Sequence, residues 1–192
     1  MVSPEECASR RALLRGAGTT LAVSAFGMLA GCGTSSAGRA SVKKVPLVVR
    51  QADVTIFNHS LSLERQAIAA YVAGIPLLNA SEAKVAKQFL NQELEHAGEL
   101  LGLIAAAGGK PIPRAPSYDL GHPRTAREVF TLLHGLEGNQ IATYLAVIPR
   151  LSPGPVRAAV ASILANDAQH LSILRLELGD SPAPAAFVTG RE

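Results

Sequence analysis

The chain repeats one pattern of acidic, aliphatic and aromatic residues, and this repeat restricts the fold more than any other feature. Residues 64–71 read Glu-Arg-Gln-Ala-Ile-Ala-Ala-Tyr and residues 137–144 read Glu-Gly-Asn-Gln-Ile-Ala-Thr-Tyr, so Glu, Ile, Ala and Tyr recur at identical spacing. An acid lies 29 residues after the first glutamate and 30 residues after the second, and a histidine follows each acid by three positions. These pairs are Glu93 with His96 and Asp167 with His170. The spacing predicts two similar structural halves.

Apolar residues recur every three or four positions in four stretches of the chain, which indicates amphipathic helices. The stretches are residues 53–73, residues 81–108, residues 125–148 and residues 155–178. Ser81, followed by Glu82, is the predicted N-cap of the second helix. No stretch alternates apolar and polar residues as a half-buried strand does, so the predicted fold class is all-α.

The connections between these helices predict their arrangement. Short turns join the first helix to the second and the third to the fourth, which favours two antiparallel hairpins. Residues 109–124 contain four prolines and join the hairpins. Sixteen extended residues reach about 50 Å, whereas a 24-residue helix is about 36 Å long, so this linker can cross the whole bundle. The sequence therefore predicts a four-helix bundle with a long central crossover.

The acids and histidines of the repeat fall within the apolar stripes of the helices. Glu93 and His96, for example, continue the stripe that contains Phe89. Four carboxylates in an apolar interior each cost several kcal/mol unless they are compensated, and a pair of divalent metal ions supplies such compensation. A hydrogen-bonded polar network without metal is the alternative. The predicted inward-facing set is Glu64, Glu93, His96, Glu137, Asp167 and His170.

One acid from each of two helices, with an acid-x-x-His pair from each of the other two, resembles the ligand pattern of the ferritin-like superfamily over residues 53–178. The likeness is greatest to its small secreted bacterial members. It implies that Glu64, Glu93 and His96 bind one metal. Glu137, Asp167 and His170 would bind the other, with Glu93 and Asp167 as candidate bridges. The metals would be two iron or manganese ions, with iron favoured and zinc permitted.

Asp167 and the two tyrosines of the repeat also bear on how the metals would be bound. Asp167 stands where the family pattern has Glu, and its shorter side chain would leave the second metal displaced, weakly bound or absent. Tyr71 and Tyr144 each follow a ligand acid by seven residues. We consider them either ordinary packing residues, or hydrogen-bonding partners of the ligands or electron donors to the metal.

The amino-terminal segment predicts export. Arg10 and Arg11 precede a run of small and apolar residues that ends at Cys32, which resembles a twin-arginine signal peptide with a lipobox. The alternatives are cleavage without lipidation and an uncleaved anchor. The expected divisions are a signal peptide (1–31), a flexible tether (32–52), the bundle (53–178) and a frayed tail (179–192). The resemblance places the protein, with a lipid on Cys32, at the outer face of the bacterial cytoplasmic membrane or in the periplasm.

Composition narrows the function further. The net charge of +3 includes three leader arginines, and the other basic residues are scattered, so no nucleic-acid partner is expected. The resemblance implies oxidation of ferrous iron by oxygen or peroxide, or removal of peroxide. One alternative is metal storage without turnover. The other is a non-catalytic envelope lipoprotein that acts in stress tolerance or partner binding. The lipid would attach the protein to the membrane. A homodimer of the bundle is compatible with this anchoring.

Overall fold

The computed structural model describes residues 48–192. The predicted signal peptide with Arg10 and Arg11, the predicted lipidation site Cys32 and most of the predicted tether lie outside the described residues. Within residues 48–192, no helix combines the length and hydropathy that crossing a membrane requires.

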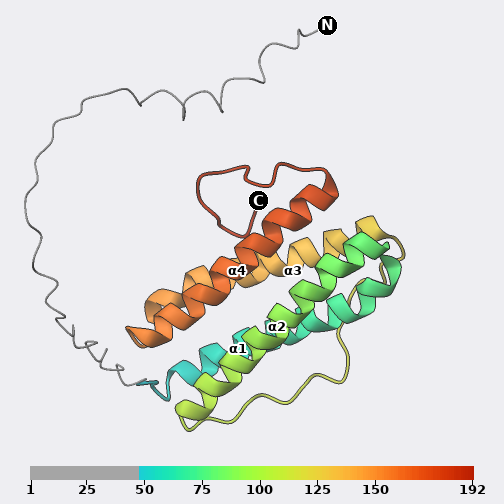
Figure 1. Ribbon diagram of the computed structural model, residues 1–192. Helices are drawn as coiled ribbons and strands as arrows, with labels where there is room; N and C mark the ends of the chain where they lie inside the picture. The colour runs from blue at the N-terminus through green and yellow to red at the C-terminus, as the bar shows by residue number, and fades with distance from the viewer. Residues whose placement is uncertain (1–47) are drawn as a thin grey trace, which may run out of the picture. The chain divides into compact units, whose positions relative to one another are not determined.

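Four helices build the fold: α1 (Asp53–Gly74), α2 (Ala80–Ala106), α3 (Ala126–Val147) and α4 (Pro155–Leu178). The helices α1 and α2 form one hairpin and α3 and α4 form the other, with α1 packed along α3 (Figure 1). The helices α2 and α4 touch at few positions. Residues 107–125 contain no helix and run back along the bundle as the crossover. The predicted all-α bundle of two hairpins joined by a crossover is confirmed.

The residues Asn79, Ser81 and Glu82 explain where α2 begins. The predicted N-cap of α2, Ser81, is wrong, because Ser81 is already the second residue of the helix and Asn79 is the cap. Asn79 Oδ1 accepts hydrogen bonds at 3.0 Å from the backbone N–H groups of Ser81 and Glu82. Glu82 Oε2 accepts one at 2.8 Å from the N–H of Asn79, which completes a capping box. Asn caps a helix as well as Ser does, so the helix gains this reciprocal pair by starting earlier.

The ends of α1 and α3 extend the repeat seen in the sequence. Each helix passes into a short 3-10 turn that begins with Ile-Pro, η1 (Ile75–Leu77) after α1 and η2 (Ile148–Arg150) after α3. Proline cannot donate the hydrogen bond that would continue the α-helix. Both turns begin four residues after the tyrosine of the repeat, so the two halves share their helix ends as well as their acids.

Two apolar clusters fill the interior. One contains Phe57 and Leu100, and the other contains Phe89 and Leu133. Along every helix, the acids and histidines of the repeat lie between the residues of one cluster and those of the other. The fold therefore seals this polar layer from both ends of the bundle.

Side-chain hydrogen bonds fasten the irregular segments to the helices. Asn58 on α1 exchanges two bonds with the crossover, donating to the carbonyl of Lys110 at 3.0 Å and accepting from the N–H of Ile112 at 2.6 Å. At the start of α1, the buried carboxylate of Asp53 accepts bonds from the N–H of Ser152 at 3.2 Å and its Oγ at 2.5 Å. The bonds of Asn58 hold the crossover against α1, and those of Asp53 hold the start of α1 against the connection between α3 and α4.

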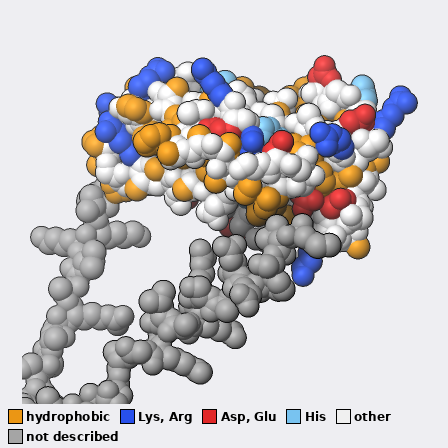
Figure 2. Space-filling model, turned by 90° about the horizontal axis from the view of Figure 1, so that it is seen from above, with side chains coloured by type: hydrophobic (Ala, Val, Ile, Leu, Met, Phe, Trp, Pro, Cys, Tyr) orange, Lys and Arg blue, Asp and Glu red, His pale blue; other side chains and the backbone are white. Residues whose placement is uncertain are grey.

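The predicted frayed tail contains no helix or strand after residue 179 and lies against α3 and α4. Arg175 Nε donates to the carbonyl of Ser181 at 2.6 Å. The backbones of Gly138 and Gly190 approach so closely that a Cβ built on Gly138 would lie 2.7 Å from the Gly190 carbonyl oxygen. On the face shown in Figure 2, basic and acidic side chains are interspersed rather than gathered in one charged patch.

Candidate metal centre

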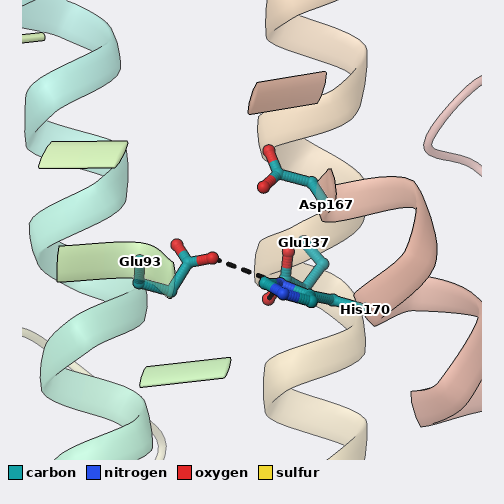
Figure 3. Close-up of side chains that lie close together, drawn as sticks. All are labelled: Glu93, Glu137, Asp167 and His170. Carbon is teal, nitrogen blue, oxygen red and sulfur yellow. Dashed lines mark hydrogen bonds and ion pairs between the residues drawn. The ribbon is translucent and has the colours of Figure 1, made fainter. Parts of the chain in front are cut away.

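The six inward-facing residues predicted from the sequence meet in the middle of the bundle. His96 is 8% exposed and the other five are 1% exposed or less. Figure 3 shows Glu93 and His170 directed toward each other from α2 and α4, with Glu137 and Asp167 beside them. The helices contribute Glu64 from α1, Glu93 and His96 from α2, Glu137 from α3, and Asp167 and His170 from α4.

Ligand-type atoms of these residues form two groups in which every atom lies within 4.8 Å of the others. One group contains Glu93, Glu137, Asp167 and His170, and the other contains Glu64, His96 and Asp167. Asp167 belongs to both groups, as a bridging residue would. Glu93 lies with the residues of α3 and α4, whereas the family resemblance placed it with Glu64 and His96.

Contacts across the bundle explain this grouping. Glu93 Oε1 lies 3.2 Å from His170 Nδ1, which is closer than its 3.5 Å to His96 Nδ1 on its own helix. Asp167 Oδ1 lies 3.3 Å from His96 Nδ1. Each acid of an acid-x-x-His pair therefore reaches the histidine of the opposite helix. Sequence spacing shows which residues share a face, but it does not show which partner faces them.

The two tyrosines of the repeat hold the glutamates of the opposite half. The Tyr71 hydroxyl donates to Glu137 Oε1 at 2.6 Å, and the Tyr144 hydroxyl donates to Glu64 Oε1. Both tyrosine side chains are buried. The structure thus brings each tyrosine to an acid on another helix, and not to the acid seven residues before it.

Two glutamines that sequence analysis missed also contact the cluster. Gln140 Nε2 donates to Glu64 Oε2 at 2.9 Å and to Glu93 Oε2 at 3.2 Å. Gln92 Oε1 lies 2.8 Å from His170 Nε2. Gln140 follows Glu137 by three residues and lies on the same face of α3, and this spacing could have predicted that Gln140 faces the cluster. The corresponding residue of the first repeat is Ala67, so a comparison of the two repeats does not identify Gln140 as a feature shared by both.

Burial and close contacts shift the acidities of the carboxylates in different directions. Burial raises the pKa of Glu64 to about 8, against a contact with the ring of His96 that lowers it. Burial, followed by repulsion from neighbouring carboxylates, also raises the pKa of Glu137 and of Asp167. Burial would raise the pKa of Glu93 too, but close contacts with the rings of His170 and His96 outweigh it and lower the pKa. Glu93 is therefore the acid that stays ionised most readily.

The histidines respond to these carboxylates. Burial alone would lower the pKa of His96, but contacts with Glu64 and Glu93 raise it to about 11. Burial likewise opposes protonation of His170, and contacts with Glu137 and Glu93 raise its pKa to about 9. Without another cation, the imidazolium groups supply the positive charge that the acids attract.

Hydrogen bonds within the described residues leave several buried ligand-type atoms of the cluster without a partner. A buried polar atom that makes no hydrogen bond is destabilising. Divalent ions that accept oxygen and imidazole ligands would satisfy these atoms, so the residues present fit a metal centre. The atoms without a hydrogen bond are Glu93 Oε1, His96 Nδ1, Glu137 Oε2 and both carboxylate oxygens of Asp167. Of these, Glu93 Oε1, His96 Nδ1 and Asp167 Oδ1 make only the ion-pair contacts described above.

The fold and the cluster define a class, a four-helix bundle with carboxylates and histidines at its centre. The family model of the ferritin-like domain matches residues 52–180, and the chain belongs to this family. The crystal structure of a conserved hypothetical protein from Mycobacterium tuberculosis is similar, with a TM-score of 0.64 and 20% sequence identity. The match covers 71% of this chain and 96% of that chain. This likeness concerns the fold. Comparison with curated proteins gives no match.

Proposed function

We propose that this ferritin-like protein binds a dinuclear iron or manganese centre, with iron favoured, and oxidises ferrous iron or removes peroxide. The observation that carries the proposal is a set of buried ligand atoms that face one another from α2, α3 and α4 and make no hydrogen bond among the described residues. Such atoms are expected to be paired in a stable core. The two groups of ligand atoms that share Asp167 support two metal positions rather than one.

The chain's own residues would hold and shield this centre. The hydroxyls of Tyr71 and Tyr144 orient the carboxylates of Glu137 and Glu64, and Gln140 restrains a second oxygen of Glu64. The apolar clusters on either side of the polar layer keep water from reaching it along the bundle from the two ends. A bound pair of ferrous ions would supply two electrons, which with two protons convert one hydrogen peroxide to two water molecules.

Metal analysis tests the proposal most directly. Protein purified without added metal, then given ferrous iron or Mn²⁺ under argon and desalted, should retain two ions per chain. Glu93→Ala and His170→Ala should lose at least one of them, whereas Glu95→Ala, on the exposed face of α2, should retain both. Oxygen consumption on addition of ferrous iron then separates turnover from storage. A folded wild type that retains no metal contradicts the proposal.

The pairing of acids and histidines favours one other candidate, a metal-free bundle that serves as an envelope lipoprotein in stress tolerance or partner binding. His96 and His170 both lie within 3.5 Å of Glu93 Oε1, so protons can neutralise much of the cluster. A wild type that is fully stable and unaffected by either metal supports this candidate.

The proposed location is the outer face of the bacterial cytoplasmic membrane or the periplasm, through a lipid on Cys32. The support is the sequence pattern of the amino-terminal segment. Cys32→Ser should move the protein from the membrane fraction to the soluble fraction. A variant that stays in the membrane fraction argues against lipidation.

A further inference from the structure

The two histidines of the cluster are covered differently on their outer edges. His170 Nε2 lies 2.8 Å from Gln92 Oε1, and the ring stacks on Phe89 with centroids 4.1 Å apart and planes inclined by 26°. The residue is 1% exposed. An acceptor on Nε2 fixes the tautomer whose Nδ1 faces the carboxylates, which is the usual role of an outer partner of a ligand histidine.

His96 lacks such a cover. Its Nδ1 faces Asp167 and Glu93, and no hydrogen bond joins its ring to another residue within the described part of the chain. The α4 residue at the position that corresponds to Gln92 is Asn166, whose side chain is one methylene shorter and makes no hydrogen bond to His96. His96 is 8% exposed, against 1% for His170. The pseudosymmetry of the repeat therefore breaks at these outer contacts.

The uncovered edge of His96 meets a groove between α2 and α4. The groove has a hollow of about 560 Å³ over His96 and a second hollow of about 490 Å³ over Phe89 and His170. Gln92, Asn166 and Gln169 line both hollows and so stand between them. Gln92 reaches from α2 to Nε2 of His170, which lines the second hollow, whereas no described side chain makes a hydrogen bond to the ring of His96, which lines the first.

We propose that Gln92 makes the two metal positions unequal. The position beside His170 is closed, whereas the position beside His96 opens to the groove, exchanges its metal and admits a small oxygen-donor ligand of the size of peroxide. Gln92 is a positioning residue that acts through His170. The inference rests on the proposed function, because it assigns roles to the two halves of that centre.

Release of Co²⁺ from the loaded protein tests the inference without any turnover. Wild-type protein that holds two Co²⁺ ions, mixed with excess chelator, should lose its absorption in two phases of equal amplitude. His96→Ala should remove the fast phase and keep the slow one. Gln92→Leu should accelerate the slow phase by roughly tenfold to a hundredfold, the effect that loss of an outer partner has on a metal ligand.

Matched variants separate this role from packing. Gln92→Glu keeps an oxygen acceptor for His170 and should keep the slow phase slow. Gln169→Leu is the control, since Gln169 lines the same two hollows but donates to Ala165 of its own helix. It should change neither phase. Gln92→Asn, which copies Asn166 of the other half, should accelerate the slow phase and serves if the leucine variant does not fold.

Each outcome decides one of the two proposals. Two bound Co²⁺ ions that leave in a single phase overturn the inference and leave the dinuclear centre standing. The same holds if folded Gln92→Leu and Gln92→Asn both release metal like the wild type. A wild type that binds no Co²⁺, iron or manganese overturns the proposed function and the inference with it.

Discussion

Metal binding should raise the thermal stability of the domain, and the size of this rise should depend on how many of the two ligand groups bind an ion. Each group that binds an ion at a free metal concentration one hundred times its Kd adds about 2.7 kcal/mol to the free energy of unfolding. Two groups, as the structure has them, add about 5 kcal/mol. At about 3 °C per kcal/mol for a domain of this size, the midpoint of unfolding should rise by about 15 °C.

Differential scanning calorimetry of chelator-treated protein, with and without Mn²⁺, measures this rise. Glu137→Gln alters a residue that belongs to one group only and should reduce the rise to about half, or about 8 °C. Glu95→Gln lies on the exposed face of α2 and should leave the rise unchanged. The reasoning is refuted if the wild type shows no rise, or if all three proteins show the same rise.

Three further substitutions test the scaffold. Asp53→Asn should cost about 1–3 kcal/mol at pH 7 in urea unfolding, because it weakens charge-assisted bonds from Ser152 to a buried carboxylate. Burial raises the pKa of Asp53, but bonds from Ser152 outweigh it and the net pKa is lowered, so this stabilisation is present above pH 4 and disappears as the pH falls through the folded pKa. A cost that is equal at pH 7 and pH 2 would show that ionisation plays no part. Gly138→Ala should displace the tail, because its Cβ would lie 2.7 Å from the Gly190 carbonyl oxygen, and limited proteolysis should then cleave the tail faster. Gly135→Ala on the same helix meets no atom within 4 Å and should instead add up to about 1 kcal/mol of stability, which urea unfolding would measure, without exposing the tail.

Helix positions and the inward set could be predicted because both depend on local spacing. The 3.6-residue period places Glu64 and Glu93 within apolar stripes, and proline and glycine mark where helices begin and end. α4, from Pro155 to Leu178 with Gly179 as its left-handed C-cap, matches its predicted bounds for this reason. The cap of α2 was missed because Asn79 and Ser81 are both good capping residues. Sequence alone offered no energy difference between them.

The sequence by itself determined the class of fold, the six buried acids and histidines, and the two-fold repeat that brings them from four helices. Tertiary structure alone decided their partners. Whether Glu93 lies nearer His96 or His170, and whether Gln92 reaches across a groove where Asn166 does not, depends on the register and separation of α2 and α4. The helices α2 and α4 are not consecutive in the chain. Residue spacing within one helix shows which of its side chains share a face, but it does not show which side chains of the other helix they contact. The repeat therefore predicts a symmetric site, and packing between helices makes its two halves different.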